Sequence, residues 1–293
     1  MPRTIHSVCM AIKNASWGNM EDEADKLADV LKGIYIPPQP AIIERINEVA
    51  PDMAAIAALI EKDASISGNI IKIINTSAFN LPNTITSIKQ AVMLLGLKEV
   101  IGLVNGLKIR AAFEDDNPEA LEHFWQLNED IAVCCALLVR RLDLGDPGEA
   151  YMLGLFHNCG IPAVKTKFKH YDQLLRDAYL QDKCSMMDFI EADIHTSHCV
   201  VGYLIAKHWK LPQHICEAIR DHRDSRRFNM PDPASDGLLY ALKMAEQICE
   251  EATRLTGVPN NPRWQKTADF ILAKLCLSDE DFEDLVNEIK DQM

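Results

Sequence analysis

The residues best suited to chemistry are histidines in the second half of the chain. His157 and Asn158 stand together at an apolar helix end, and His195, His198 and His222 follow further along. Neutral imidazoles bind a divalent ion and let it acidify a bound water, provided that a carboxylate balances the charge. The amide of Asn158 ligates weakly and adds no charge. The pattern therefore leaves two interpretations, a weakened metal site or a histidine that only forms hydrogen bonds at a helix end.

A dense basic patch surrounds the last of these histidines. It contains Arg220, Arg223, Arg226 and Arg227 beside His222. A guanidinium group can donate two parallel hydrogen bonds to two oxygens of one phosphate. Arg220 and Arg223 are therefore candidate contacts for a phosphate or a nucleotide. Cations are also favoured near the carboxyl end of a helix, where they complement its dipole. A solvated run of charge at a helix end is the alternative interpretation.

A polar segment over residues 75–83 interrupts the apolar pattern of the first hundred residues. Phe79 and Leu81 are the large apolar residues in it. Asn75 and Ser77 are the candidate contacts for a ligand or a partner in this segment. A purely structural connector is the alternative, since asparagine, serine and proline are also the residues of turns.

Helical spacing of apolar residues runs through most of the chain and predicts an all-α protein. Ile66, Ile70, Ile73 and Ile74 form one such stripe, and no segment alternates as a strand would. The sequence Asp-Asp-Asn-Pro at 115–118 punctuates the pattern most clearly, so we place a boundary there. The predicted parts are an N-terminal segment 1–18, a helical subdomain 19–117, a second helical subdomain 118–225 and a C-terminal helical extension 226–293.

Composition limits the class of protein further. The net charge of −13 and the pI of 5.1 argue against general affinity for nucleic acid. Nine cysteines without a CxxC spacing indicate free thiols and hence a reducing compartment. The first residues lack the apolar core of a secretory leader, and the most apolar stretch, 91–109, is interrupted by Lys98 and Glu99. We therefore expect a cytoplasmic protein without a membrane span.

Several segments occur in the order found in the HD-related output domain (HDOD) family, and the chain resembles this family over about residues 20–225. They are 36–40 (IPPQP), 60–79 (IEKDASISGNIIKIINTSAF), 85–100 (ITSIKQAVMLLGLKEV), Phe124-Trp125, 154–160 (GLFHNCG), 198–212 (HCVVGYLIAKHWKLP) and 218–222. The resemblance implies two packed helical subdomains, the second related to the HD metal-dependent phosphohydrolases, and a role in bacterial signalling or regulation.

The sequence departs from the HD pattern at positions that would hold the metal. Leu127 stands where the resemblance leads one to expect a first ligand histidine, Asn158 replaces the aspartate of the HD pair, and Arg223 replaces a second histidine. The remaining positions of a degenerate metal site are His157, His198 and His222, together with Asn158 itself.

Two functions are compatible with these residues. The favoured one is a non-catalytic regulatory module that binds a protein partner or a small signalling molecule, in a pocket between the two subdomains or at residues 75–83. It needs no cofactor, and neither nucleic acid nor a membrane is an expected partner. The alternative is a metal-dependent phosphohydrolase for a nucleotide or phosphate ester, with Zn, Mn, Mg or Fe as its ion. The sequence leaves the signal and the oligomeric state open.

Overall fold

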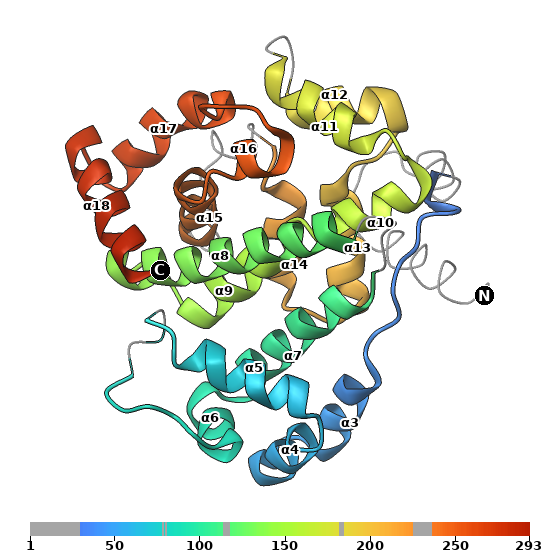
Figure 1. The fold of residues 1–293 in the computed structure, drawn as a ribbon, viewed down its shortest axis with the longest axis vertical. Helices are drawn as coiled ribbons and strands as arrows, with labels where there is room; N and C mark the ends of the chain where they lie inside the picture. Colours follow the sequence, from blue (N-terminus) through green and yellow to red (C-terminus); the bar gives the residue numbers. More distant parts are fainter. Residues whose placement is uncertain (1–29, 78, 80, 114–117, 182–184, 225–235) are drawn as a thin grey trace.

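The computed structural model confirms the all-α prediction, because its described residues form helices and no strand (Figure 1). It describes residues 30–77, 79, 81–113, 118–181, 185–224 and 236–293. The predicted N-terminal segment 1–18, the first residues of the predicted subdomain 19–117, the boundary at 115–117 and Arg226 and Arg227 lie outside these residues.

The first group of helices is built around a layer of isoleucines. Its members are α3 (Ala41–Val49), α4 (Met53–Ile60), α5 (Ala64–Ile74), α6 (Ile88–Leu95) and α7 (Leu97–Ala111). Asp52 and Asp63 start α4 and α5, because each carboxylate accepts two backbone N–H groups of the first turn. The predicted stripe on α5 is buried, and Ile70 and Ile74 have no exposed surface. Gly96 separates α6 from α7 with a φ of 85°, a conformation that glycine adopts without strain.

The second group surrounds one long helix and a shorter helix packed closely against it. Its members are α8 (Pro118–Leu142), α9 (Pro147–Phe156), α10 (Gly160–Lys167), α11 (Tyr171–Leu180), α12 (Met186–Ile194), α13 (His198–His208) and α14 (Gln213–Asp221). At the contact between α8 and α9, a Cβ on Gly154 would lie 2.6 Å from the Cα of Ala132. Only glycine fits there, so Gly154 lets α9 approach α8 closely and sets the position of the helix end that follows.

The C-terminal helices complete the second group rather than standing apart from it. They are α15 (Asp236–Ile248), α16 (Glu251–Thr256), α17 (Pro262–Lys274) and α18 (Asp279–Gln292). Helix α15 packs against α8 and α9, and α16 packs against α11. A capping box starts α18, in which the side chains of Ser278 and Asp281 each accept a hydrogen bond from the other's backbone N–H.

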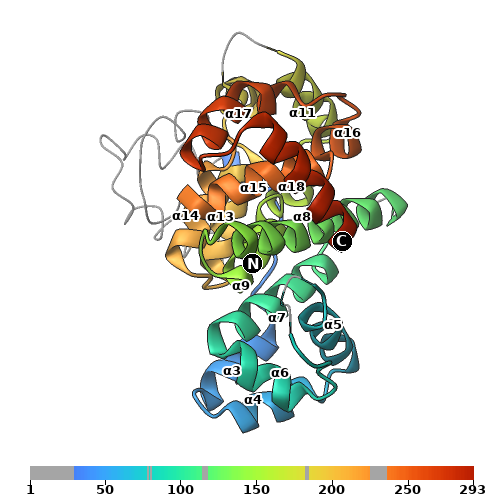
Figure 2. The ribbon, with the colours of Figure 1, turned by 90° about the vertical axis from the view of Figure 1, so that its left-hand side faces the viewer.

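A cleft lies where the two groups of helices meet. Figure 2 shows α3 to α7 gathered at one end of the molecule and α8 to α18 at the other. The cleft has a volume of about 810 Å³ and is lined by α5, α7, α8 and α9, including Phe113, Trp125 and Tyr151. No helix among the described residues is both long and apolar enough to cross a bilayer.

A buried cluster of histidines and ion pairs as the candidate functional site

Three helix ends bring the predicted histidines together. His157 ends α9, His198 begins α13 and His222 directly follows α14. The hydroxyl of Ser197 caps α13 and so fixes where the helix starts. All three imidazoles are fully buried, and the ring of His222 lies 5.4 Å, centre to centre, from those of both His157 and His198. The sequence-based prediction that these histidines share one site is therefore consistent with their positions.

One half of the cluster is a network of buried charges. Arg223 donates to the Glu251 carboxylate at 2.6 Å and to Glu246 at 3.3 Å, while Lys243 donates to Glu246 at 2.6 Å. Two carboxylates thus face one guanidinium and one ammonium, and their formal charges sum to zero. Below, these four residues are called the ion-pair half.

Glu251 is the acceptor on which most of the network converges. Asn158 donates to its Oε1 at 2.7 Å, Tyr179 donates to its Oε2 at 2.8 Å, and His157 Nε2 lies 3.2 Å from Oε1. The other ring nitrogen of His157 bonds the carbonyl oxygen of Gly154 at 2.6 Å. Both ring nitrogens of His157 thus have a polar partner, as the interpretation of a histidine that forms hydrogen bonds at a helix end expects.

Opposite charges favour the ionised forms of Glu251 and Arg223, whereas burial dominates the pKa of Lys243. Burial alone would raise the pKa of Glu251, but Arg223 and His157 together hold it well below its usual range. Burial disfavours the charged form of Arg223, yet Glu246 and Glu251 raise its pKa above the usual value. Burial lowers the pKa of Lys243, and Glu246 offsets part of that effect.

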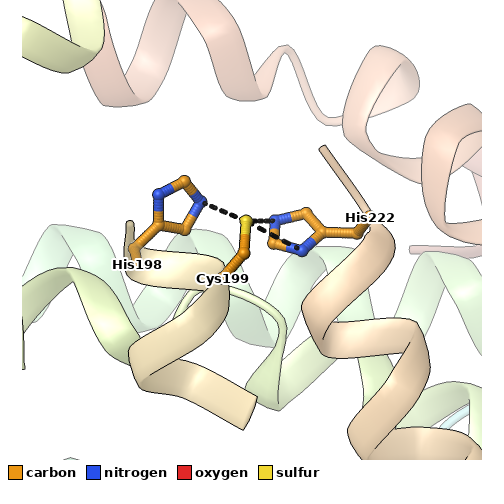
Figure 3. Close-up of side chains that lie close together, drawn as sticks. All are labelled: His198, Cys199 and His222. Atoms are coloured by element: carbon orange, nitrogen blue, oxygen red, sulfur yellow. Dashed lines mark hydrogen bonds between the residues drawn. The ribbon is translucent and has the colours of Figure 1, made fainter. Parts of the chain in front are cut away.

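The other half of the cluster holds sulfur and imidazole groups. Figure 3 shows Cys199 between His198 and His222, with its Sγ 3.5 Å from His198 Nε2 and 3.6 Å from His222 Nδ1. Burial, assisted by the charge of Arg223, lowers the pKa of both histidines well below the usual value, so both are neutral. Burial raises the pKa of the Cys199 thiol. These three residues are called the histidine–thiol half below.

The ion-pair half does not fit a divalent ion. His157, Glu246 and Glu251 have donor atoms close enough to surround one, but Arg223 and Lys243 already balance the two carboxylates. Among the described residues of this half and the side chains bonded to it, only two buried acceptor atoms lack a partner, Glu246 Oε1 and Asn158 Oδ1. Two acceptors are too few for Mg²⁺, which takes six ligands. An added ion would sit beside two buried cations without compensation.

Other predicted site residues lie elsewhere. Arg220 pairs with its neighbour Asp221 at 2.5 Å and does not join buried Arg223, so the two arginines do not form one surface patch. Asn75 exchanges hydrogen bonds with the backbone of Ile85, and Ser77 donates to the carbonyl oxygen of Gln292. These bonds give both residues of the polar segment a structural role, and their predicted contact with a ligand stays a prediction.

Sequence reasoning missed the partners that give the cluster its character. Lys243, Glu246 and Glu251 lie in the part predicted to be a C-terminal helical extension. Cys199 has only one neighbour in the sequence, His198, that suggests a role as a ligand. A signal existed for the charged residues, because the helical pattern of 238–249 places Lys243 and Glu246 three residues apart among apolar neighbours.

Comparison with protein-family models identifies the fold. The HDOD domain model matches residues 36–225. The chain belongs to the HDOD family. This confirms the resemblance found in the sequence. Among curated relatives, an uncharacterised protein of Treponema pallidum is 23% identical over 207 residues, which is 69% of this chain and 39% of the relative. The chain thus spans well under half the length of that relative.

Solved structures share the HDOD fold and carry provisional names of two kinds. A phosphohydrolase of Shewanella amazonensis has a TM-score of 0.63 at 20% identity, covering 90% of this chain and 94% of that one. A metal-dependent phosphohydrolase of the same organism has a TM-score of 0.57 at 17% identity and covers 99% of both chains. A signal transduction protein of Marinobacter aquaeolei has a TM-score of 0.57 at 18% identity, covering 99% of this chain and 62% of that one.

Proposed function

We propose that this chain is a cytoplasmic regulatory module of bacterial signal transduction, which acts by binding a ligand or partner and not by hydrolysis. The observation that carries the proposal is the ion-pair half of the cluster. Arg223 and Lys243 supply, from the chain itself, the positive charge that a hydrolytic metal would bring to Glu246 and Glu251. A fixed guanidinium has no exchangeable water to acidify, so this half cannot generate a hydroxide nucleophile.

The cleft between the two groups of helices is the proposed ligand site. Its volume of about 810 Å³ falls within the roughly 300–1,000 Å³ typical of small-molecule sites. Phe113 and Trp125 stack to form an aromatic wall. Lys108 and Arg110 bring positive charge to the lining, each paired with a carboxylate, Asp63 and Glu122 respectively. A ligand there would contact both groups of helices and so bias their relative position.

Hydrolysis is tested directly with p-nitrophenyl phosphate and bis(p-nitrophenyl) phosphate in the presence of Mg²⁺, Mn²⁺ or Zn²⁺. We expect no turnover above the protein-free rate. Asn158→Asp should be equally inactive, because Leu127 still stands where the HD pattern has a ligand and Arg223 remains in place. Metal-dependent turnover that disappears in His157→Ala would instead favour the phosphohydrolase function. The three buried histidines are the strongest support for that alternative.

Binding is tested by calorimetry with nucleoside phosphates and cyclic dinucleotides as probes. Ala111→Trp places an indole in the lining of the cleft, at an exposed position of α7, and should weaken binding of any probe by at least tenfold. Ala54→Trp, at an exposed position of α4 outside the cleft, is the matched control and should bind as the wild type does. Equal binding by both variants would remove the cleft from the proposal.

A further inference from the structure

We propose that His198, Cys199 and His222, the histidine–thiol half, form a binding site for a zinc ion, independent of the ligand cleft and of the ion-pair half. The three side chains come from the start of α13 and the end of α14, and all are fully buried. Their donor atoms, one from each residue, lie within 4.8 Å of one another. This set contains a thiol and no carboxylate, unlike the His157, Glu246 and Glu251 set beside it.

The distances already approach those of a zinc site. Zinc binds thiolate at about 2.3 Å and imidazole nitrogen at about 2.0–2.1 Å, which places the two donors about 3.6 Å apart at a tetrahedral angle. Cys199 Sγ lies 3.5 Å from His198 Nε2 and 3.9 Å from His222 Nε2. All three donor atoms lie within 4.8 Å of one another, so closing the site requires the side chains to move together onto one ion.

Hydrogen bonds behind each imidazole orient it for ligation. His222 Nδ1 lies 2.7 Å from the carbonyl oxygen of Ile219, which only accepts, so Nδ1 carries the proton and Nε2 carries the lone pair. His198 Nδ1 lies 2.7 Å from the hydroxyl of Tyr171, and the proposed site uses the tautomer whose Nδ1–H donates to that oxygen. Such partners behind metal-bound histidines fix the ring and its tautomer.

The donor types select zinc over the ions of oxygen-rich sites. Thiolate and imidazole suit Zn²⁺, whereas Mn²⁺ and Mg²⁺ prefer carboxylate, carbonyl and water oxygens. On binding, the S–H bond of Cys199 breaks, an S–Zn bond forms and the proton leaves to solvent. The two positive charges of the zinc ion and the one negative charge of the thiolate then sum to one positive charge. Arg223 and Lys243 add nothing to this sum, because Glu246 and Glu251 balance them. The sequence predicts no required cofactor for a regulatory module and a divalent metal for the alternative function, and the proposed site adds zinc to the regulatory module.

The test uses the full chain, freed of metal with a chelator and then titrated with ZnCl₂, MnCl₂ or MgCl₂. We expect one equivalent of zinc to bind, the melting temperature to rise with zinc, and neither manganese nor magnesium to raise it comparably. Cobalt(II) should add a thiolate-to-metal charge-transfer band to the near-ultraviolet spectrum. Cys199→Ala should abolish this band and weaken zinc binding by at least about 100-fold, beyond the roughly 10–100-fold typical when a partner behind a ligand is lost.

Two control cysteines separate this site from adventitious binding. Cys216→Ala removes a buried thiol outside the cluster, and Cys276→Ser removes an exposed one. Both variants should bind zinc as the wild type does. If Cys199→Ala does not fold, Cys199→Ser keeps nearly the same size and takes its place. The proposal is overturned if the folded wild type shows no cobalt–thiolate band, if zinc binding survives in the Cys199 variant, or if it is lost in Cys276→Ser.

Discussion

The isoleucine layer of α5 and the ion-pair half of the cluster are both buried, yet they stabilise the protein in different ways. Ile66, Ile70, Ile73 and Ile74 contribute through apolar surface removed from water, which depends on shape and hardly on pH. Arg223 and its two carboxylates stabilise the fold only when all three are present, because removing one of them leaves a buried charge without its counter-charge. Substitutions in the isoleucine layer should therefore lower the free energy of unfolding in proportion to the apolar volume removed. Loss of a single charge from the ion-pair half should cause a large decrease at once.

The largest effect is expected for Arg223→Met. Removing the guanidinium leaves Glu246 with only Lys243 and removes the ion pair of Glu251, so the free energy of unfolding should fall by about 3–5 kcal/mol. Denaturant titration measures this. Arg220→Met is the matched control, because Arg220 pairs with Asp221 near the surface, and its loss should cost no more than about 1 kcal/mol. Equal losses would contradict the importance of the buried network.

Ile73→Ala should reduce the free energy of unfolding by roughly 2–5 kcal/mol, because it empties part of a packed layer. The neighbouring Ile71, which is only half-buried, provides the control, and Ile71→Ala should cost less. The same denaturant titration applies to both. A larger loss in Ile71→Ala would mean that the layer faces the other side of α5.

The pH dependence of these two variants sharpens the contrast. In the wild type, the pKa of Glu251 lies below its ordinary value of 4.5, so its contribution is present above that value and is lost as pH falls through the folded-state pKa. Without Arg223, burial dominates and raises this pKa, so protonation relieves the variant as pH falls. The destabilisation by Arg223→Met should therefore shrink between pH 7 and acid pH. The loss in Ile73→Ala should stay constant, and a parallel decrease in both variants would refute this distinction.

His157→Ala should have an intermediate effect of about 1–3 kcal/mol. The change leaves the buried carbonyl oxygen of Gly154 without its imidazole partner and takes one of several contacts from Glu251. Thermal and chemical unfolding measure the loss. A cost below about 0.5 kcal/mol would mean that these contacts contribute little and that His157 behaves as a ligand whose partners are gone.

The smallest effect is expected for Asn75→Ala, at about 0.5–1.5 kcal/mol. The variant loses the paired bonds to the backbone of Ile85, which tie the end of α5 to the segment before α6, at an exposed position. Ligand binding in the cleft should be unchanged, as calorimetry can show. Loss of binding without loss of stability would return Asn75 to the predicted contacts with a ligand.

The same contrast explains what the sequence could and could not predict. Ile70 and Ile73 repeat with the period of a helix, so their burial follows from local spacing alone. The histidines were recognisable from their types and from the order of family segments. Glu251 was not, since an acidic residue near a helix start is usually solvated and its burial depends on Arg223, far away in the sequence. Arg223 itself looked like a surface cation, because charge alone does not reveal which counter-charge folds against it.

The position of Glu251 along the chain also orders events during synthesis. Arg223 leaves the ribosome before either of its carboxylates, and Glu251 follows 28 residues later. At roughly 5–20 residues per second, a nascent chain carries the unpaired guanidinium for about 1–6 s. Among the described residues, the helices α3 to α7 contain their own apolar layer and bury no charged side chain. During synthesis, the residues of the apolar layer in α3 to α7 are therefore all present early, whereas the ion-pair half is complete only after Glu251 has been added.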